Sequence, residues 1–91
     1  MKVKKVNRSE VRELLFEGVR AEALSIAQAL KMTRQIVSKN QAEYAKLVKV
    51  SKKIIADIES GKGNPTLSTL NRLFTPVGIE VSLRIISKDH Q

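Results

Sequence analysis

The sequence predicts a small all-α domain of four to five helices that ends in one β-strand. Apolar residues recur every three or four positions through most of the chain, which is typical of helices with one buried face. Capping residues and glycines stand where these patterns begin and end. Near the C-terminus the apolar period changes to two, as in a half-buried strand. With 91 residues, the chain is long enough for one core and too short for two.

The first 22 residues are expected to form a basic extension that carries a short helix, capped by Ser9. A second apolar pattern with spacings of three and four runs from Val19 to Val37. Gly18 lies between the two patterns. The sequence leaves open whether this glycine divides two helices or sits inside one helix over residues 9–37.

The centre of the chain, within a predicted domain over residues 23–76, holds three short helical patterns. Asn40 is expected to cap the first, and Glu43 completes a capping box with it. Ser51 is expected to cap the second, which Gly61 ends in a left-handed conformation. Thr66 opens the third.

Residues 77–91 are expected to form a C-terminal strand and a polar tail. The apolar positions of this strand are Ile79, Val81, Leu83 and Ile85. A lone strand leaves backbone donors and acceptors unpaired on both edges, and no other segment is an obvious partner. We therefore expect the strand to pair with its own copy across a two-fold axis, which predicts a homodimer.

Composition restricts the function. Lys and Arg outnumber Asp and Glu by 17 to 9, and this excess favours a polyanionic partner, either nucleic acid or an anionic lipid surface. The chain has no cysteine, and its one histidine is His90, so we expect no enzyme, no metal site and no cofactor. No apolar run is long enough to span a membrane, and the basic start lacks the apolar core of a signal peptide. A cytoplasmic protein is expected.

Residues 40–62 have the spacing of a helix, a turn of three to four residues and a second helix. The small Ala45 stands where the two helices would cross, and Val50 and Ile55 would pack in the corner between them. The second helix would expose Lys52 and Lys53 near its N-terminus, the end that enters a major groove in helix-turn-helix proteins.

This stretch resembles the XRE-type helix-turn-helix of lambda-class phage repressors and Cro proteins. The resemblance covers roughly residues 27–74 and is carried by Gln41, Ala45, Val50, Ser51, Ile55, Ile58, Glu59, Gly61 and the run from Asn64 to Leu67. Lys49 stands at a turn position that is often glycine. Together with the following strand, this lambda-repressor-like domain is most similar to the HipB-like and HigA-like antitoxins, which repress their own promoters as dimers and mask a toxin.

The resemblance implies a set of DNA-binding residues, namely Gln41, Ser51, Lys52, Lys53, Ala56, Asp57, Ser60 and Lys62. In this set Gln41 would contact a phosphate, and Lys52 and Lys53 would read base edges. The alternatives without DNA contact are that Gln41 only begins its helix and that both lysines are ordinary solvated surface residues. Asp57 would either accept a hydrogen bond from a cytosine or pair with Lys53 one helical turn away. Arg34 and Glu59 would form a structural ion pair that orients the motif.

The function that the resemblance implies is a sequence-specific repressor that binds double-stranded operator DNA with an inverted repeat. It would be the antitoxin of a toxin–antitoxin operon and would neutralise a HipA-like kinase encoded by an adjacent gene. Two alternatives remain: a HigA-like antitoxin of a ribonuclease toxin, and a stand-alone XRE-type regulator. Residues 1–22 would bind the toxin, the DNA or neither.

Overall fold

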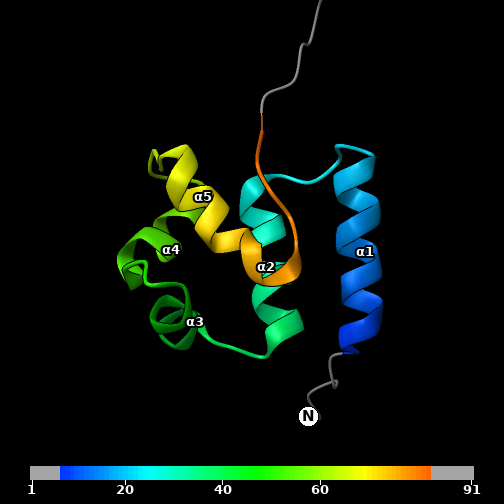
Figure 1. The fold of residues 1–91 in the computed structure, drawn as a ribbon, viewed down its shortest axis with the longest axis horizontal. Coiled ribbons are helices and arrows are strands. Elements are labelled where there is room, and N and C mark those ends of the chain that lie inside the picture. Colours follow the sequence, from blue (N-terminus) through cyan, green and yellow to red (C-terminus); the bar gives the residue numbers. More distant parts are fainter. Residues whose placement is uncertain (1–6, 83–91) are drawn as a thin grey trace, which may run out of the picture.

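The computed structural model describes residues 7–82, which form an all-helical domain (Figure 1). The helices are α1 (Arg8–Arg20), α2 (Ile26–Val37), α3 (Gln41–Val48), α4 (Lys52–Glu59) and α5 (Leu67–Phe74), followed by the 3-10 turn η1 (Thr75–Val77). The prediction of a domain of four to five helices is confirmed for this part of the chain. None of these helices is long and apolar enough to cross a membrane.

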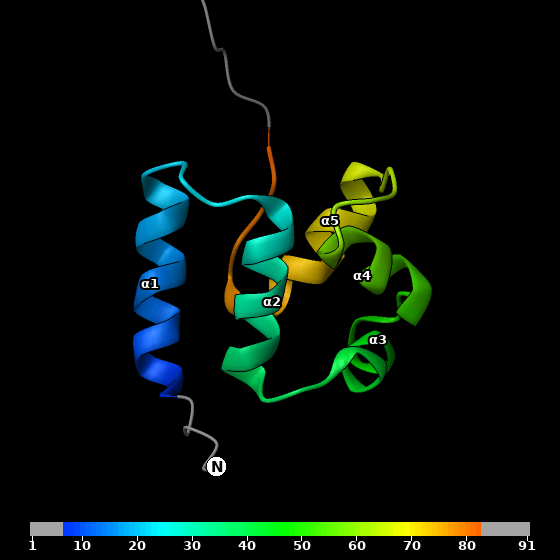
Figure 2. The same cartoon turned by 180° about the vertical axis from the view of Figure 1, so that it is seen from behind.

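The helix α2 lies at the centre of the fold. Along one side it runs antiparallel to α1, and on its other side lie α3, α4 and α5 (Figures 1 and 2). Leu15 of α1 and Leu30 of α2 are fully buried in the same core as Ile55 and Leu73. Because Leu15 shares this core, α1 belongs to the same folded unit as the helices that follow it. The core is mostly aliphatic.

The predicted caps of the central helices are confirmed. Asn40 and Glu43 form a reciprocal capping box, with N–O distances of 2.7 and 2.9 Å. The hydroxyl of Ser51 accepts from the amide of Ile54 at 3.2 Å and begins α4. Thr66 caps α5 in the same way. Each cap satisfies a backbone donor that has no partner inside the helix.

The start of the first helix was predicted wrongly. Its N-cap is Asn7, whose side chain accepts from the amide of Glu10, and Ser9 lies inside the helix. Residues 9–37 form two helices, and the break falls after Gly18, which is still inside α1. A Cβ atom at Gly18 would lie 2.5 Å from the side chain of Leu24, so the glycine makes room for the returning chain. Ser25 then begins α2.

The predicted C-terminal strand is not found in the described residues, because Ile79–Ser82 form no strand. The amide of Ile79 donates to the carbonyl of Phe74 at 3.1 Å, and the amide of Val81 donates to the side chain of Asn71 at 2.6 Å. The predicted alternation is nevertheless present, since Ile79 and Val81 are half-buried against the core. Leu83 and Ile85 lie outside the described residues.

Tyr44 links α3 to the end of α5. Its side chain is fully buried, and its hydroxyl donates to the carbonyl of Leu73. Burial raises the pKa of Tyr44 to about 12. Since the phenol ionises near pH 10 in an unfolded chain, the folded state keeps its proton longer, and this contribution to stability is lost as the pH rises from about 10 to about 12.

Replacing Tyr44 by Phe should lower the free energy of unfolding by about 1 kcal/mol, because the carbonyl of Leu73 then loses its donor inside the core. Urea denaturation followed by circular dichroism measures this. The variant should also lose stability less steeply than the original chain between neutral pH and about pH 11, since the phenol is gone. Equal urea midpoints for the two chains would mean that the hydroxyl contributes nothing.

Candidate nucleic-acid interface

The helices α3 and α4 are joined by the three residues Lys49, Val50 and Ser51. Lys49 has a left-handed backbone with φ of 60°, which a residue with a Cβ adopts at a cost of about 1 kcal/mol. This conformation lets the amide of Val50 donate to the carbonyl of Ala45 at 3.1 Å. Ala45 and Ile55 are buried in the shared core. The small side chain at 45 leaves room for the two helices to approach closely.

A buried carboxylate near the C-terminus of α4 ties three helices together. Glu59 is 7% exposed and accepts two hydrogen bonds from Arg34 of α2, at 2.6 and 2.8 Å. The side-chain amide of Gln41, the first residue of α3, donates to the same carboxylate at 3.0 Å. The guanidinium of Arg34 also donates to the carbonyl of Lys39, just before α3. The fork of Arg34 therefore holds α4 against α2 and fixes the start of α3.

The charges of this cluster stabilise each other. Burial alone would raise the pKa of Glu59, but the hydrogen bonds from Arg34 and Gln41 outweigh it, with the positive charges of Arg34 and Lys31 helping, so the pKa lies below its usual value. The hydrogen bond to Glu59 raises the pKa of Arg34. Both groups are ionised near neutral pH. The charge of Arg34 is thus matched by Glu59.

The outer face of α4 is basic near its N-terminus. Lys52 and Lys53 are exposed, and Ala56 is half-exposed on the same side, whereas Ile55 and Ile58 face the core. The ammonium of Lys53 lies 3.1 Å from the carboxylate of Asp57, one turn further along. Such an exposed pair contributes only about 0.3–0.5 kcal/mol, so it holds the ammonium of Lys53 only weakly.

A shallow hollow lies where the N-termini of α3 and α4 come together. Its lining consists of Arg34, Asn40, Gln41, Ala42 and Lys52. The first backbone N–H groups of a helix and its dipole favour an anion at such a place. The side chain of Gln41 is bound to Glu59, so a phosphate here would be held by the backbone at the start of α3 and by the ammonium of Lys52.

The remaining predicted contacts lie at the ends of α4. The hydroxyl of Ser51 accepts from the amide of Ile54, and the hydroxyl of Ser60 donates to the carbonyl of Asp57 at 3.0 Å. The hydroxyl of Ser51 therefore caps the start of α4, and that of Ser60 binds at its end. Lys62 is exposed in the loop after α4, where its amide donates to the same carbonyl of Asp57 at 2.7 Å. The structure brings Lys62 and Lys53 to opposite ends of one helix.

Two contacts were not anticipated from the sequence. One is the bond from Gln41 to Glu59, which gives Gln41 a structural role at the start of α3. The other is the bond from Arg72 of α5 to the carbonyl of Lys49 in the turn, at 3.3 Å. Nothing in the spacing of the sequence indicates that Arg72 would reach the turn, because the two residues meet only when α5 folds back.

The fold and the exposed basic helix define the chain as a DNA-binding domain of the helix-turn-helix class. The helix-turn-helix family model matches residues 30–82, more than half of the chain. The protein belongs to this XRE-type helix-turn-helix family. Within residues 7–82, no group of three His, Asp or Glu side chains lies close enough together to hold a metal ion.

A phage protein shows a similar sequence. The chain is 34% identical over 59 residues to the immunity repressor protein of Bacillus phage phi105. The aligned region covers 65% of this chain and 41% of the phage protein, so the chain spans less than half the length of that relative. No solved structure gave a significant match.

Replacing Glu59 by Gln should lower the free energy of unfolding by about 2–3 kcal/mol at neutral pH, because Arg34 keeps its charge and loses its ionic partner. The folded pKa of Glu59 lies below the ordinary value of 4.5, so its contribution is present above that pH and is lost as the pH falls through the folded pKa. The difference between the two chains in urea denaturation should therefore shrink in acid.

The matched control is Glu17→Gln, since Glu17 is exposed on α1 and the substitution has the same chemistry. This control should unfold within about 0.5 kcal/mol of the original chain. A Glu59→Gln variant as stable as the control would show that the cluster does not hold the helices together.

Proposed function

We propose that the protein is a sequence-specific transcriptional repressor that binds operator DNA as a dimer. The observation that carries this proposal is the exposed, basic N-terminal part of α4, held in place from behind by the hydrogen bonds of Arg34 and Gln41 to the buried Glu59. A helix that is fixed by its buried side and open on its outer side can enter a major groove without rearrangement.

The two lysines have different tasks in this proposal. Lys53 and Ala56 are on the outer side of α4, so they would meet base edges, a guanine for the lysine and a thymine methyl for the alanine. Lys52 lines the hollow at the start of α3, so it would bind a phosphate together with the backbone of Gln41. Lys62 would contact a DNA phosphate beyond the C-terminal end of α4. Affinity would come largely from phosphates and fall with salt.

A dimer would place two copies of α4 in successive major grooves about 34 Å apart, so the operator would be an inverted repeat. The relative from phage phi105 is named an immunity repressor, which supports a repressor that acts without a toxin. The antitoxin role, with a kinase or ribonuclease toxin as partner, stays a prediction from the resemblance. Co-purification with the product of an adjacent gene would test it.

Replacing Lys52 and Lys53 by Ala should abolish specific binding to the promoter and leave the helical circular dichroism unchanged, because both side chains are exposed. Gel-shift titrations against the DNA upstream of the gene, with shuffled competitor and at two salt concentrations, measure this. Removing two phosphate or base contacts should also reduce the slope of log K against log salt by about 1 to 2.

The charge-matched control removes Arg12 and Arg20, which are exposed on α1, on the far side of α2 from α4 (Figures 1 and 2). This variant has the same net charge as the double lysine variant. It should keep specific binding and lose only a small part of the non-specific affinity. Equal losses of DNA affinity in both variants would mean that only the net charge of the protein attracts DNA, and this would contradict the proposed interface.

Asp57 distinguishes two ways in which α4 meets DNA. If Asp57 mainly pairs with Lys53, as the 3.1 Å contact suggests, then Asp57→Ala should raise the affinity for all sequences, because a negative charge leaves the interface. In a selection of binding sites from random DNA, we therefore expect the preferred sequence to stay the same while the affinity for the selected and the unselected DNA rises. A change of preference at a single position, with unchanged affinity elsewhere, would instead make Asp57 a reader of cytosine.

A further inference from the structure

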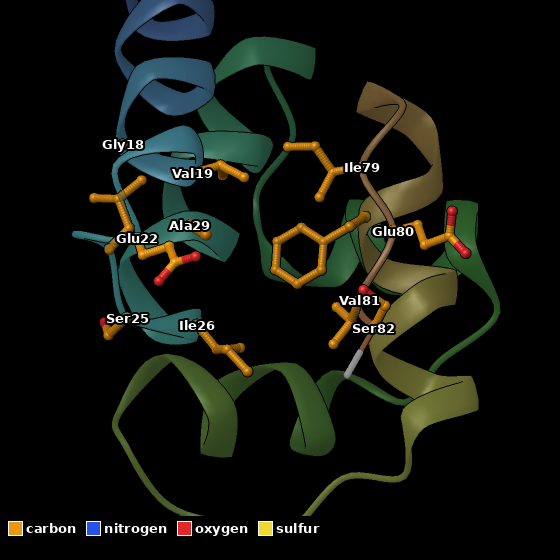
Figure 3. A pocket seen from close by; sticks show the side chains of 12 residues that line it. Gly18, Val19, Glu22, Ser25, Ile26, Ala29, Ile79, Glu80, Val81 and Ser82 are labelled. Carbon is orange, nitrogen blue, oxygen red and sulfur yellow. The ribbon is translucent and has the colours of Figure 1, made fainter. Parts of the chain in front are cut away.

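Within residues 7–82, three helices are followed by a left-handed residue that is not glycine. These residues are Glu22 after α1, Ser38 after α2 and Lys49 after α3, with φ of 55°, 56° and 60°. The conformation costs free energy for any residue that has a Cβ. Ser38 binds Arg8 through its hydroxyl at 3.2 Å, and Glu22 lines a groove beside the start of α2 (Figure 3). The side chain of Lys49 instead lies exposed in the turn before α4.

The peptide unit that follows Lys49 is held at both of its polar atoms. Its carbonyl accepts from the guanidinium of Arg72 in α5 at 3.3 Å. Its N–H, which belongs to Val50, donates to the carbonyl of Ala45 at 3.1 Å. A strained backbone conformation persists only where its surroundings enforce it, as these two bonds do here. For the backbone of Lys49 to relax, one of them would have to break, so the Cβ atom leaves the turn in a fixed direction.

Two positive side chains lie at this turn without a negative partner. Lys49 and Arg72 are both exposed, and neither forms an ion pair with a carboxylate of residues 7–82. A guanidinium carries five N–H donors, and the carbonyl of Lys49 uses only one nitrogen of Arg72. Two like charges at one place raise the local positive potential, and a phosphate that contacted both would be bound by charge-assisted hydrogen bonds.

The turn lies close to the phosphate position proposed above for Lys52. Lys49 precedes Lys52 by three residues, so their Cα atoms are at most about 11 Å apart. Each strand of a DNA duplex carries one negative charge per about 3.4 Å of helix axis. A strand that passes Lys52 therefore has further phosphates within this span. The flexible four-carbon stem of a lysine lets the ammonium of Lys49 reach one of them.

We propose that Lys49 and Arg72 form a second phosphate-binding point, which holds the DNA backbone beside the phosphate of Lys52. A glycine at position 49 would avoid the backbone strain but would present no ammonium to the DNA. Binding here is independent of base sequence, because phosphates carry no sequence information directly. The inference rests on the proposed function and deepens it, since it adds a contact at a turn position where the repressors that this chain resembles often have glycine.

Lys49→Gly separates the backbone strain from the charge. Glycine adopts the left-handed conformation without strain, so the urea midpoint of unfolding should not fall. The affinity for DNA should nevertheless fall roughly fivefold at about 0.1 M salt, and the slope of log K against log salt should shrink by about 0.9. Gel-shift titrations at several salt concentrations measure both. An affinity and a slope equal to those of the original chain would overturn the proposal.

Two controls test whether the charge acts at this place. Lys49→Arg keeps the charge and should keep the affinity and the salt slope. Arg20→Ala removes one charge from the exposed end of α1 and should leave the slope unchanged. A loss in Arg20→Ala as large as that in Lys49→Gly would overturn the proposal in favour of a general charge attraction.

Arg72→Gln tests the second cation. Glutamine keeps an N–H donor on the side chain and removes the positive charge, so the helical circular dichroism should be unchanged. The affinity should fall about as much as in Lys49→Gly, and the two substitutions together should reduce the salt slope by about 1.8. A double variant with the slope of the original chain would overturn the shared site.

Photo-cross-linking locates the turn on the DNA, because the chain has no cysteine of its own. A Lys49→Cys variant labelled with an aryl azide should cross-link to promoter DNA on illumination. The same label on Leu14→Cys should not, since Leu14 is 60% exposed on α1, on the far side of α2 from α4 (Figures 1 and 2). Equal cross-linking from both positions would overturn the placement of the turn beside the DNA backbone.

The outcomes distinguish this inference from the repressor function. Promoter-specific binding that Lys49→Gly leaves unchanged, in affinity and in salt slope, would overturn the second contact and leave the repressor standing. Equal binding of the original chain to promoter and shuffled DNA, weakened on both by Lys49→Gly, would support the contact and overturn the sequence-specific repressor.

Discussion

The buried carboxylate of Glu59 is the constraint on which the geometry of the helix-turn-helix depends. A carboxylate that is 7% exposed must be paired and hydrogen-bonded, or it would not remain ionised. Its partners come from two other helices, Arg34 from α2 and Gln41 from α3. The three helices therefore cannot shift relative to one another without breaking a charged hydrogen bond. The apolar contacts of Ala45 and Ile55 fill the space between them but do not set a single orientation so strictly.

The same cluster decides which charges are available to DNA. The charge of Arg34 is matched by Glu59, which it contacts at 2.6 Å. A phosphate in the neighbouring hollow would also meet Lys52 and the backbone N–H groups at the start of α3. Lys53 has only the weak exposed pair with Asp57. The motif thus separates a rigid ionic cluster on its buried side from exchangeable charges on its outer side.

The caps of the central helices were predictable because each depends on residues no more than four positions apart. Asn40 with Glu43, Ser51 and Thr66 need only their own first turn. The start of α1 was predicted wrongly because Asn7 and Ser9 are about equally good capping residues, so local sequence alone does not choose between them. The role of Gly18 could not be predicted from neighbouring residues either, because the glycine leaves space for the side chain of Leu24, which packs there only after the chain turns back. The bond from Gln41 to Glu59 spans 18 residues and follows from the fold alone.

The helix α5 connects the turn of the helix-turn-helix to the segment after η1. Arg72 donates to the carbonyl of Lys49 in the turn, and its neighbour Asn71 accepts from the amide of Val81 in the segment after η1. Tyr44 adds a third link, from α3 to the carbonyl of Leu73. Adjacent residues of a helix point in different directions, so one short helix can hold both segments at once. In a dimeric repressor, the position of α4 relative to the contact between the two copies would set the spacing of the operator half-sites.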